Sequence, residues 1–203
     1  MIKKEKLEKI GIDDKWLEPL NKAFQKYHIT DLNEKAMFLA QTTHESNDYK
    51  RLEESFRYTP QRLFEVFRKR VGTLENAQKL CNEGAKYIAD FVYGGRLGNA
   101  KDEGYKYRGR GIIQLTGKNN YKYYGEKLNI DLVNNPHLAK EPDTAIEIAL
   151  LFWKEKECGL YAKIGDVKTV TKLINGGYNG LDDRQKRFEK YKRYWRNKWE
   201  LRH

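Results

Sequence analysis

Two glutamates in the segment QTTHESNDYKRLEESF, residues 41–56, have the spacing needed for paired acid–base chemistry. Glu45 follows an apolar helical face, so its carboxyl would lie where a helix end meets the core, and loss of solvent favours a protonated, proton-donating carboxyl. An unbroken helix would place Glu54 roughly 13 Å away and on the opposite side. Asn47-Asp48 predicts a turn that could bring Glu54 back towards Glu45. Two carboxyls facing each other at roughly 6.5–9.5 Å can carry out inverting glycoside hydrolysis.

Spacing alone leaves two alternatives open for this pair. Glu45 is equally consistent with a surface glutamate at a frayed helix end, and Glu53 competes with Glu54 for the second position. Neighbouring residues on a strand or turn point their side chains differently, so only one of Glu53 and Glu54 can face Glu45.

A second segment, YRGRGIIQLTGKNNY at residues 107–121, combines glycines with polar side chains. Glycine allows close approach of the backbone to a neighbour or ligand. If Gly109 and Gly111 let the chain pass near the glutamates, Arg108 or Arg110 could tune the carboxylate charge. Three further side chains could bind sugar hydroxyls or hold a water, namely Gln114, Thr116 and Asn120. The alternative is a glycine-bearing hairpin with incidental polar residues.

Other reaction classes find little support in the chain. His44-Glu45 begins an HExxH pattern, but position 48 is Asp48 and not the second histidine that a zinc site needs. No GxSxG and no GxxxxGK[ST] occurs. Cys81 and Cys158 form no CxxC pair and are predicted to be buried thiols and not a disulfide. We expect no metal and no cofactor, because carboxyls alone can perform both proton transfers.

Helical periodicity predicts a mainly α fold in one domain, residues 1–203, with a short β or loop excursion near residues 93–117. The segment 143–153 is apolar on nearly every side and is predicted to be a central buried helix. Other helices are expected at residues 13–27, 31–43, 60–67, 73–92 and 166–174.

The formal net charge of +11 predicts an anionic partner. The densest basic region is a predicted amphipathic helix at about residues 181–200, with Phe188, Tyr191, Trp195 and Trp199 on its apolar stripe. Its basic face could approach an anionic wall or membrane surface. No zinc-finger, RRM-like or helix-turn-helix pattern supports nucleic-acid binding. The N-terminus has no apolar run of the length that a signal peptide needs.

Taken together, THES at 43–46, YRGRGIIQLTGKNNY, and LINGGYNG at 173–180 resemble glycoside hydrolase family 19, in its short phage-type endolysin branch. The likeness covers residues 30–195. It implies a mainly α, lysozyme-like, two-lobed fold with a central cleft, and inverting cleavage of β-1,4 links in chitin or peptidoglycan. The endolysin branch usually reads ENLNYS where this chain has ESFRYT, and Gly95 replaces a usual asparagine.

The resemblance also implies roles for single residues. Glu45 matches the general acid, Glu54 the base, and Thr116 the residue that positions the attacking water. Substrate contacts are implied for Gln114, Asn120, Asn175, Tyr93 and Arg96, whereas Arg187 matches an arginine that pairs with cleft carboxylates.

From this resemblance we expect a monomeric, peptidoglycan-degrading endolysin of the muramidase type. It would be made in the host cytoplasm and would reach the wall after holin-type release. The alternatives are a chitinase on the same scaffold and a non-catalytic wall-binding module.

Overall fold

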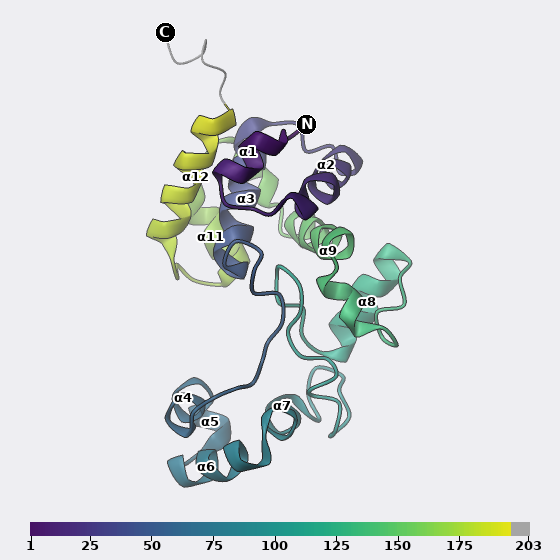
Figure 1. The fold of residues 1–203 in the computed structure, drawn as a ribbon, viewed down its shortest axis with the longest axis vertical. Helices are drawn as coiled ribbons and strands as arrows, with labels where there is room; N and C mark the ends of the chain where they lie inside the picture. Colours follow the sequence, from purple (N-terminus) through teal and green to yellow (C-terminus); the bar gives the residue numbers. More distant parts are fainter. Residues whose placement is uncertain (196–203) are drawn as a thin grey trace. The chain divides into compact units, whose positions relative to one another are not determined.

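The computed structural model describes residues 1–195 and is mainly helical (Figure 1). The chain divides into two compact units. Unit 1 comprises residues 1–51 together with the described residues from 140 onward, and unit 2 comprises Leu52–Ala139. Glu45 therefore belongs to unit 1, whereas Glu54 belongs to unit 2.

Unit 1 is a bundle of helices with few irregular segments. Aspartates cap three of its helices, because Asp13, Asp31 and Asp166 each accept a hydrogen bond from the first turn. Its elements are α1 (Lys4–Lys9), η1 (Asp14–Trp16), α2 (Leu17–Lys26), α3 (Leu32–Ser46), α9 (Pro142–Glu155), α10 (Cys158–Lys163), α11 (Val167–Asn175) and α12 (Leu181–Trp195).

Helix α3 is the most enclosed helix of unit 1. Every residue from 36 to 43 is buried, and Phe38 packs edge-on against Phe24 and Trp153 at ring-centroid distances of 5.6 and 5.4 Å. The prediction that 143–153 is the central helix is only partly right, since α9 is largely buried but keeps Glu147 on an outer face bonded to Lys26 and Tyr27. Polar residues of α3 can be buried because each finds an internal partner.

Unit 2 packs four short helices around one apolar core, with a fifth, α8 (Lys118–Leu128), further along the chain. Thr59 and Thr73 cap α4 (Pro60–Val66) and α6 (Leu74–Glu83), and α5 (Arg68–Val71) lies between them in the sequence. The helix predicted for 73–92 is in fact two, α6 and α7 (Ala85–Tyr93). Gly84 separates them with φ of 92°, a conformation that ends a helix.

The glycine-rich segment of unit 2 forms turns held by isolated bridges. Arg110 pairs with Leu115, as in the predicted hairpin, and also with Glu53. Hydrogen bonds from Glu54 N to Gly109 O (2.9 Å) and from Gly111 N to Leu52 O (2.8 Å) continue this pairing. The segment that carries the two candidate bases is thus fastened directly to the glycine-rich turn.

Both cysteines are free, as predicted, with Cys158 buried and Cys81 half-buried. Burial raises the pKa of the Cys158 thiol to about 12. Within residues 1–195, no helix combines the length and apolarity that crossing a bilayer demands. Trp199, which the sequence places on the C-terminal apolar stripe, lies outside the described residues.

Candidate active site

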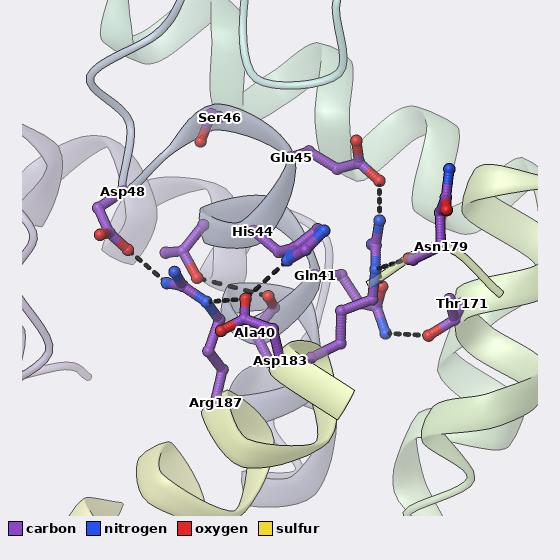
Figure 2. Close-up of polar contacts among 12 residues, drawn as sticks. Ala40, Gln41, His44, Glu45, Ser46, Asp48, Thr171, Asn179, Asp183 and Arg187 are labelled. Atoms are coloured by element: carbon purple, nitrogen blue, oxygen red, sulfur yellow. Dashed lines mark hydrogen bonds and ion pairs between the residues drawn. The ribbon is translucent and has the colours of Figure 1, made fainter. Parts of the chain in front are cut away.

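Glu45 occupies the last turn of α3, where an arginine from α12 reaches it (Figure 2). Arg184 forms an ion pair with Oε1 of Glu45. The Arg184 side chain is only 1% exposed, whereas that of Glu45 is 28% exposed. Arg184 also donates to Oε1 of Gln41 at 2.6 Å and to the carbonyl of Asn179 at 3.1 Å. A buried guanidinium with several acceptors holds one oxygen of Glu45 in a fixed position.

The Gln41 side chain extends this network towards α11. Its Nε2 donates to Oγ1 of Thr171 at 3.1 Å, and Thr171 in turn donates to the carbonyl of Val167 at 2.7 Å. Gln41 and Thr171 are fully buried, so these hydrogen bonds form in a low-dielectric interior. Three helices of unit 1 therefore converge on the position of Glu45.

A second polar network lies one turn further along α12 (Figure 2). Arg187 donates to Asp183 Oδ2 at 2.7 Å and to Asp48 Oδ1 at 2.5 Å, and His44 Nδ1 lies 2.7 Å from the same Asp183 oxygen. Burial alone would raise the pKa of Asp183, but the hydrogen bonds from His44 and Arg187 outweigh burial and lower it.

The sequence resemblance assigned Arg187 to the cleft carboxylates, and the structure gives the Glu45 contact to another arginine. Arg187 pairs with Asp48 and Asp183, while Arg184 pairs with Glu45. The reason is geometric, since residues three apart on a helix are displaced by nearly one turn along its axis. Arg184 could have been found in the sequence, because it extends the buried stripe of Phe188, Tyr191 and Trp195 by four residues towards the N-terminus.

The chain leaves α3 through an unusual left-handed turn. Asn47, Asp48 and Tyr49 have φ of 51°, 55° and 61°, a region that non-glycine residues seldom occupy. Buried contacts hold the turn, since the Tyr49 hydroxyl lies 2.8 Å from Oγ1 of Thr42 and its ring packs on Trp16. The turn predicted at Asn47-Asp48 is confirmed, and the Asp48–Arg187 ion pair adds to its stability.

In unit 2, Glu54 is held by the backbone and by a tyrosine. Its Oε2 accepts a hydrogen bond from the Gly109 amide at 3.2 Å, and its Oε1 accepts one from the Tyr93 hydroxyl at 3.2 Å. Burial, followed by the neighbouring Glu54 charge, raises the pKa of Tyr93, which keeps its hydroxyl a donor. The Tyr93 ring packs edge-on against Phe56, which belongs to the unit 2 core.

Gly109 is the point at which the predicted polar residues of unit 2 meet. A Cβ atom there would lie 2.9 Å from Oε1 of Gln114 and 3.3 Å from both Oε2 of Glu54 and Oγ1 of Thr116. Gln114 itself has a left-handed backbone with φ of 53°. A methyl group at this position would contact all three side chains, so at least one of them would have to shift.

Glu53 has a different environment from its neighbour Glu54. Its Oε1 accepts hydrogen bonds from Arg108 at 2.5 Å and from Arg110 at 2.9 Å. Arg110 is 5% exposed and also donates to the Tyr121 hydroxyl at 3.0 Å. The arginines that the sequence offered as tuning groups therefore bind Glu53, whose charge is compensated by two cations.

Three further predicted contact residues, Asn120, Arg96 and Asn175, are exposed, and a neighbouring asparagine, Asn99, is buried. Asn120 donates to the carbonyl of Thr116 at 2.8 Å, and Arg96 donates to that of Val92 at 3.4 Å. Asn99 is buried and donates to the carbonyl of Tyr93 at 3.0 Å, which fixes the residue that contacts Glu54. Asn175 is exposed at the end of α11.

Within residues 1–195, no group of three or more histidine, cysteine, aspartate or glutamate side chains is arranged to hold a metal ion. The polar groups of the two units are carboxylates, amides, hydroxyls and guanidiniums. Such groups can transfer protons and bind hydroxyl-rich molecules.

Comparisons with known proteins agree with this chemistry. The family model of glycoside hydrolase family 19, described as chitinase class I, matches residues 24–162. A glycosyl hydrolase family 19 domain-containing protein of Haemophilus influenzae is 38% identical over 156 residues, covering 75% of this chain and 76% of the relative. Chitinase 11 of Oryza sativa is 34% identical over 113 residues, and the match spans less than half of the rice protein, 44%.

The fold also resembles solved structures. Chitinase C from Streptomyces griseus superposes with a TM-score of 0.63 at 17% identity, covering 95% of this chain and 91% of that protein. A second bacterial family 19 chitinase gives a TM-score of 0.63 at 20% identity. The predicted mainly α, lysozyme-like fold is confirmed.

Proposed function

We propose that this chain, which belongs to glycoside hydrolase family 19, cleaves β-1,4 glycosidic bonds of bacterial peptidoglycan by an inverting mechanism with two carboxylates. Membership of the family makes the chain a glycosidase. The observation that carries the proposed mechanism is the convergence of Glu54, Gln114 and Thr116 on the α-carbon of Gly109. This arrangement offers a base, a hydroxyl and an amide to one small volume, as activation of a water requires.

Glu45 is the proposed general acid. Arg184 holds Oε1, while Oε2 accepts no hydrogen bond from the described residues of unit 1, so Oε2 is the oxygen available to carry the proton. In the reaction, that proton passes to the glycosidic oxygen as the bond between this oxygen and the anomeric carbon breaks. The leaving sugar departs as an alcohol, and Glu45 returns to the carboxylate form that pairs with Arg184.

Glu54 is the proposed base. A water held beside Thr116 attacks the anomeric carbon from the opposite face and gives a proton to Glu54. Tyr93 and the Gly109 amide orient the carboxylate, while Gln114 contacts the sugar or the water. Glu53 is unsuited to this role because Arg108 and Arg110 already engage its Oε1.

Two observations support peptidoglycan as the substrate. The net charge of +11 favours the anionic bacterial wall over neutral chitin. The motif THES and the glycine-rich segment resemble the endolysin branch.

Digestion of purified sacculi tests the substrate. The protein is incubated with sacculi and, separately, with chitin hexamers, and the fragments are analysed by mass spectrometry after borohydride reduction. The proposal predicts reduced muramic acid at the new ends. New ends that carry only glucosamine would contradict muramidase specificity, and soluble products from chitin alone would contradict the peptidoglycan assignment.

Chitin hydrolysis is the second candidate, because relatives with 34% and 33% identity are named chitinase 11 and endochitinase A2. A non-catalytic wall-binding module is the third. Sedimentation of the protein with sacculi, without release of reducing ends, would support that module and contradict both enzymes.

The proposal extends to partners and to the place of action. The protein acts as a monomer on glycan strands after holin-type release from the host cytoplasm. The exposed Lys186, Lys190 and Arg193 of α12 approach the anionic wall. Bacteria are made to express this chain with or without a holin. Lysis that requires the holin would support the route, and equal lysis without the holin would contradict it.

A further inference from the structure

The turn that joins α4 to α6 in unit 2, residues 66–74, carries three consecutive exposed cations: Arg68, Lys69 and Arg70. We call residues 66–74 the α5 corner, because the short helix α5 lies at the centre of this segment (Figure 1). Its sequence, VFRKRVGTL, contains no acidic residue. The buried Val71 anchors the corner in the unit 2 core, so the cations are displayed from a fixed backbone.

The acidic residues that flank the corner are already paired with other cations. Glu65 binds Arg62 at 3.1 Å, and Glu75 binds Lys79 at 2.8 Å. Within residues 1–195, no carboxylate forms an ion pair with Arg68, Lys69 or Arg70. Their three positive charges are therefore available to an external anion.

Aromatic rings hold two of the three cations. The Arg68 guanidinium lies 5.3 Å from the Phe64 ring centre, and that of Arg70 lies 5.7 Å from the Phe91 ring centre. Arg70 also donates through Nε to the carbonyl of Phe91 at 3.2 Å. Because the contact uses Nε, the two terminal nitrogens keep their donor fork, which fits phosphate oxygens.

Two aliphatic side chains flank the cations at the surface. Val66 is 42% exposed and Leu74 is 46% exposed. A hydrophilic polyanion offers nothing to such side chains, whereas the interface of a bilayer accepts cations at its phosphates and aliphatic groups just below them. A second copy of this chain is a poor occupant because each copy carries a net charge of +11.

We propose that the α5 corner docks on an anionic phospholipid bilayer. Arg68, Lys69 and Arg70 contact lipid phosphates, and Val66 and Leu74 enter the interface. Each cation near such a surface strengthens binding about five-fold, so the three together contribute about 100-fold. This inference does not depend on the proposed function, since it concerns lipid binding in the absence of glycan.

The test is co-sedimentation of the full chain with vesicles of phosphatidylcholine and phosphatidylglycerol mixed two to one, with pure phosphatidylcholine as the neutral reference. The corner variant R68Q/K69Q/R70Q is compared with K101Q/K122Q/K127Q, which removes the same charge from other exposed lysines of unit 2. We expect about 100-fold weaker binding for the corner variant and less than about five-fold for the control. Equal losses would overturn the proposal, because net charge alone would then explain binding.

Two further variants separate the rival explanations. V66S/L74S should weaken vesicle binding by several fold while leaving binding to soluble polyphosphate unchanged; no effect on vesicles would identify the corner as a polyanion site and overturn the proposal. The α12 variant K186Q/K190Q/R193Q should resemble the control, and a larger loss than in the corner variant would place the docking surface on α12 instead. Lys69→Glu is the variant least expected to disturb folding, because the Lys69 side chain has no described partner. It should weaken vesicle binding by about 25-fold.

Discussion

The two candidate carboxylates are positioned by different physical means. Glu45 lies at the end of a buried helix and is held by charge, through an arginine that is 1% exposed. Glu54 lies on irregular backbone and is held by an amide, a tyrosine hydroxyl and the close approach allowed by Gly109. Replacement of Arg184 should therefore change the position of Glu45. At Gly109, the addition of a single methyl group should be enough to displace Glu54.

Because Glu45 and Glu54 are held differently, substitutions around them should affect the stability and the activity of the protein to different extents. A buried guanidinium that loses its carboxylate is destabilised, because desolvation of the charge is no longer compensated. The amide and the hydroxyl that contact Glu54 are neutral donors, and neutralising a carboxylate leaves no buried charge behind at such donors. We therefore expect the unit 1 variants to change stability and activity together, and the unit 2 variants to change mainly activity.

The largest effect is expected for the two carboxylates themselves. Glu45→Gln and Glu54→Gln should each lower the turnover of sacculi by about 10³-fold, because each removes one proton transfer. Thermal unfolding should distinguish them, with a loss of about 1–3 kcal/mol for Glu45→Gln, which leaves Arg184 without its carboxylate, and a smaller change for Glu54→Gln. Wall lysis at the wild-type rate by either variant would reject its assigned role.

The next largest loss of activity is expected for Gly109→Ala. The new methyl group would displace Gln114, Glu54 or Thr116, and misplacement of a catalytic group by about 1 Å can cost up to about 100-fold in rate. The expected loss of kcat is about 10- to 100-fold, with the circular dichroism spectrum unchanged. Activity close to wild type would show that the three side chains do not act together.

Arg184→Lys tests the charge network of unit 1. Lysine keeps the charge but loses the fork that reaches Glu45, Gln41 and Asn179, so we expect about a ten-fold loss of kcat and about 2–3 kcal/mol of stability. Arg187→Lys is the matched control, since its pairs with Asp48 and Asp183 are more exposed. A larger effect at Arg187 would return the central role to the residue that the sequence favoured.

Glu53→Gln distinguishes the neighbouring glutamates. Because Glu53 serves Arg108 and Arg110, the variant should lose about 1–2 kcal/mol of stability while retaining kcat within about five-fold. The readouts are urea unfolding and initial rates on sacculi. If Glu53→Gln is as inactive as Glu54→Gln, the base has been assigned to the wrong residue.

The smallest effect concerns acid stability. Hydrogen bonds from His44 and Arg187 lower the pKa of Asp183 below its ordinary value of 3.8. The contribution of ionised Asp183 to the stability of the folded protein is therefore complete above about pH 3.8. This contribution disappears as the pH falls through the lower pKa that Asp183 has in the folded state. Between pH 4 and pH 2, the melting temperature of Asp183→Asn should fall less steeply than that of the wild type. Parallel slopes would contradict a contribution from Asp183.

Local signals in the sequence predicted most of the helices. Aspartate and threonine caps, and proline after Thr59, mark helix starts because their chemistry acts within one turn. The break at Gly84 was missed because the apolar stripe continues through it, and α8 was missed because its periodicity is weak. Propensity cannot show how tertiary packing encloses α3, where Gln41, Thr42 and Thr43 are buried together with the apolar residues 36–40.

The candidate site could be predicted from the sequence only in part. Residue type, motif spacing and the family resemblance select Glu45, Glu54, Gln114 and Thr116 as candidates, and their catalytic roles stay predictions. The partner of Glu45 is not among them. The apolar stripe of α12 indicates that Arg184 and not Arg187 is buried, but it does not show that the Arg184 guanidinium reaches Glu45. Likewise, the two arginines that bind Glu53 become visible only when residues 52–54 pair with residues 109–111.

The anomeric form of the first product is the most direct test of the two-carboxylate account. Proton NMR of a soluble glycan fragment, recorded within the first minutes of digestion by the wild-type protein, resolves α from β at the new reducing end before mutarotation. If water activated by Glu54 attacks opposite the bond that Glu45 protonates, the β-linked substrate must give the α anomer. A first product in the β form would show retention and would contradict the account.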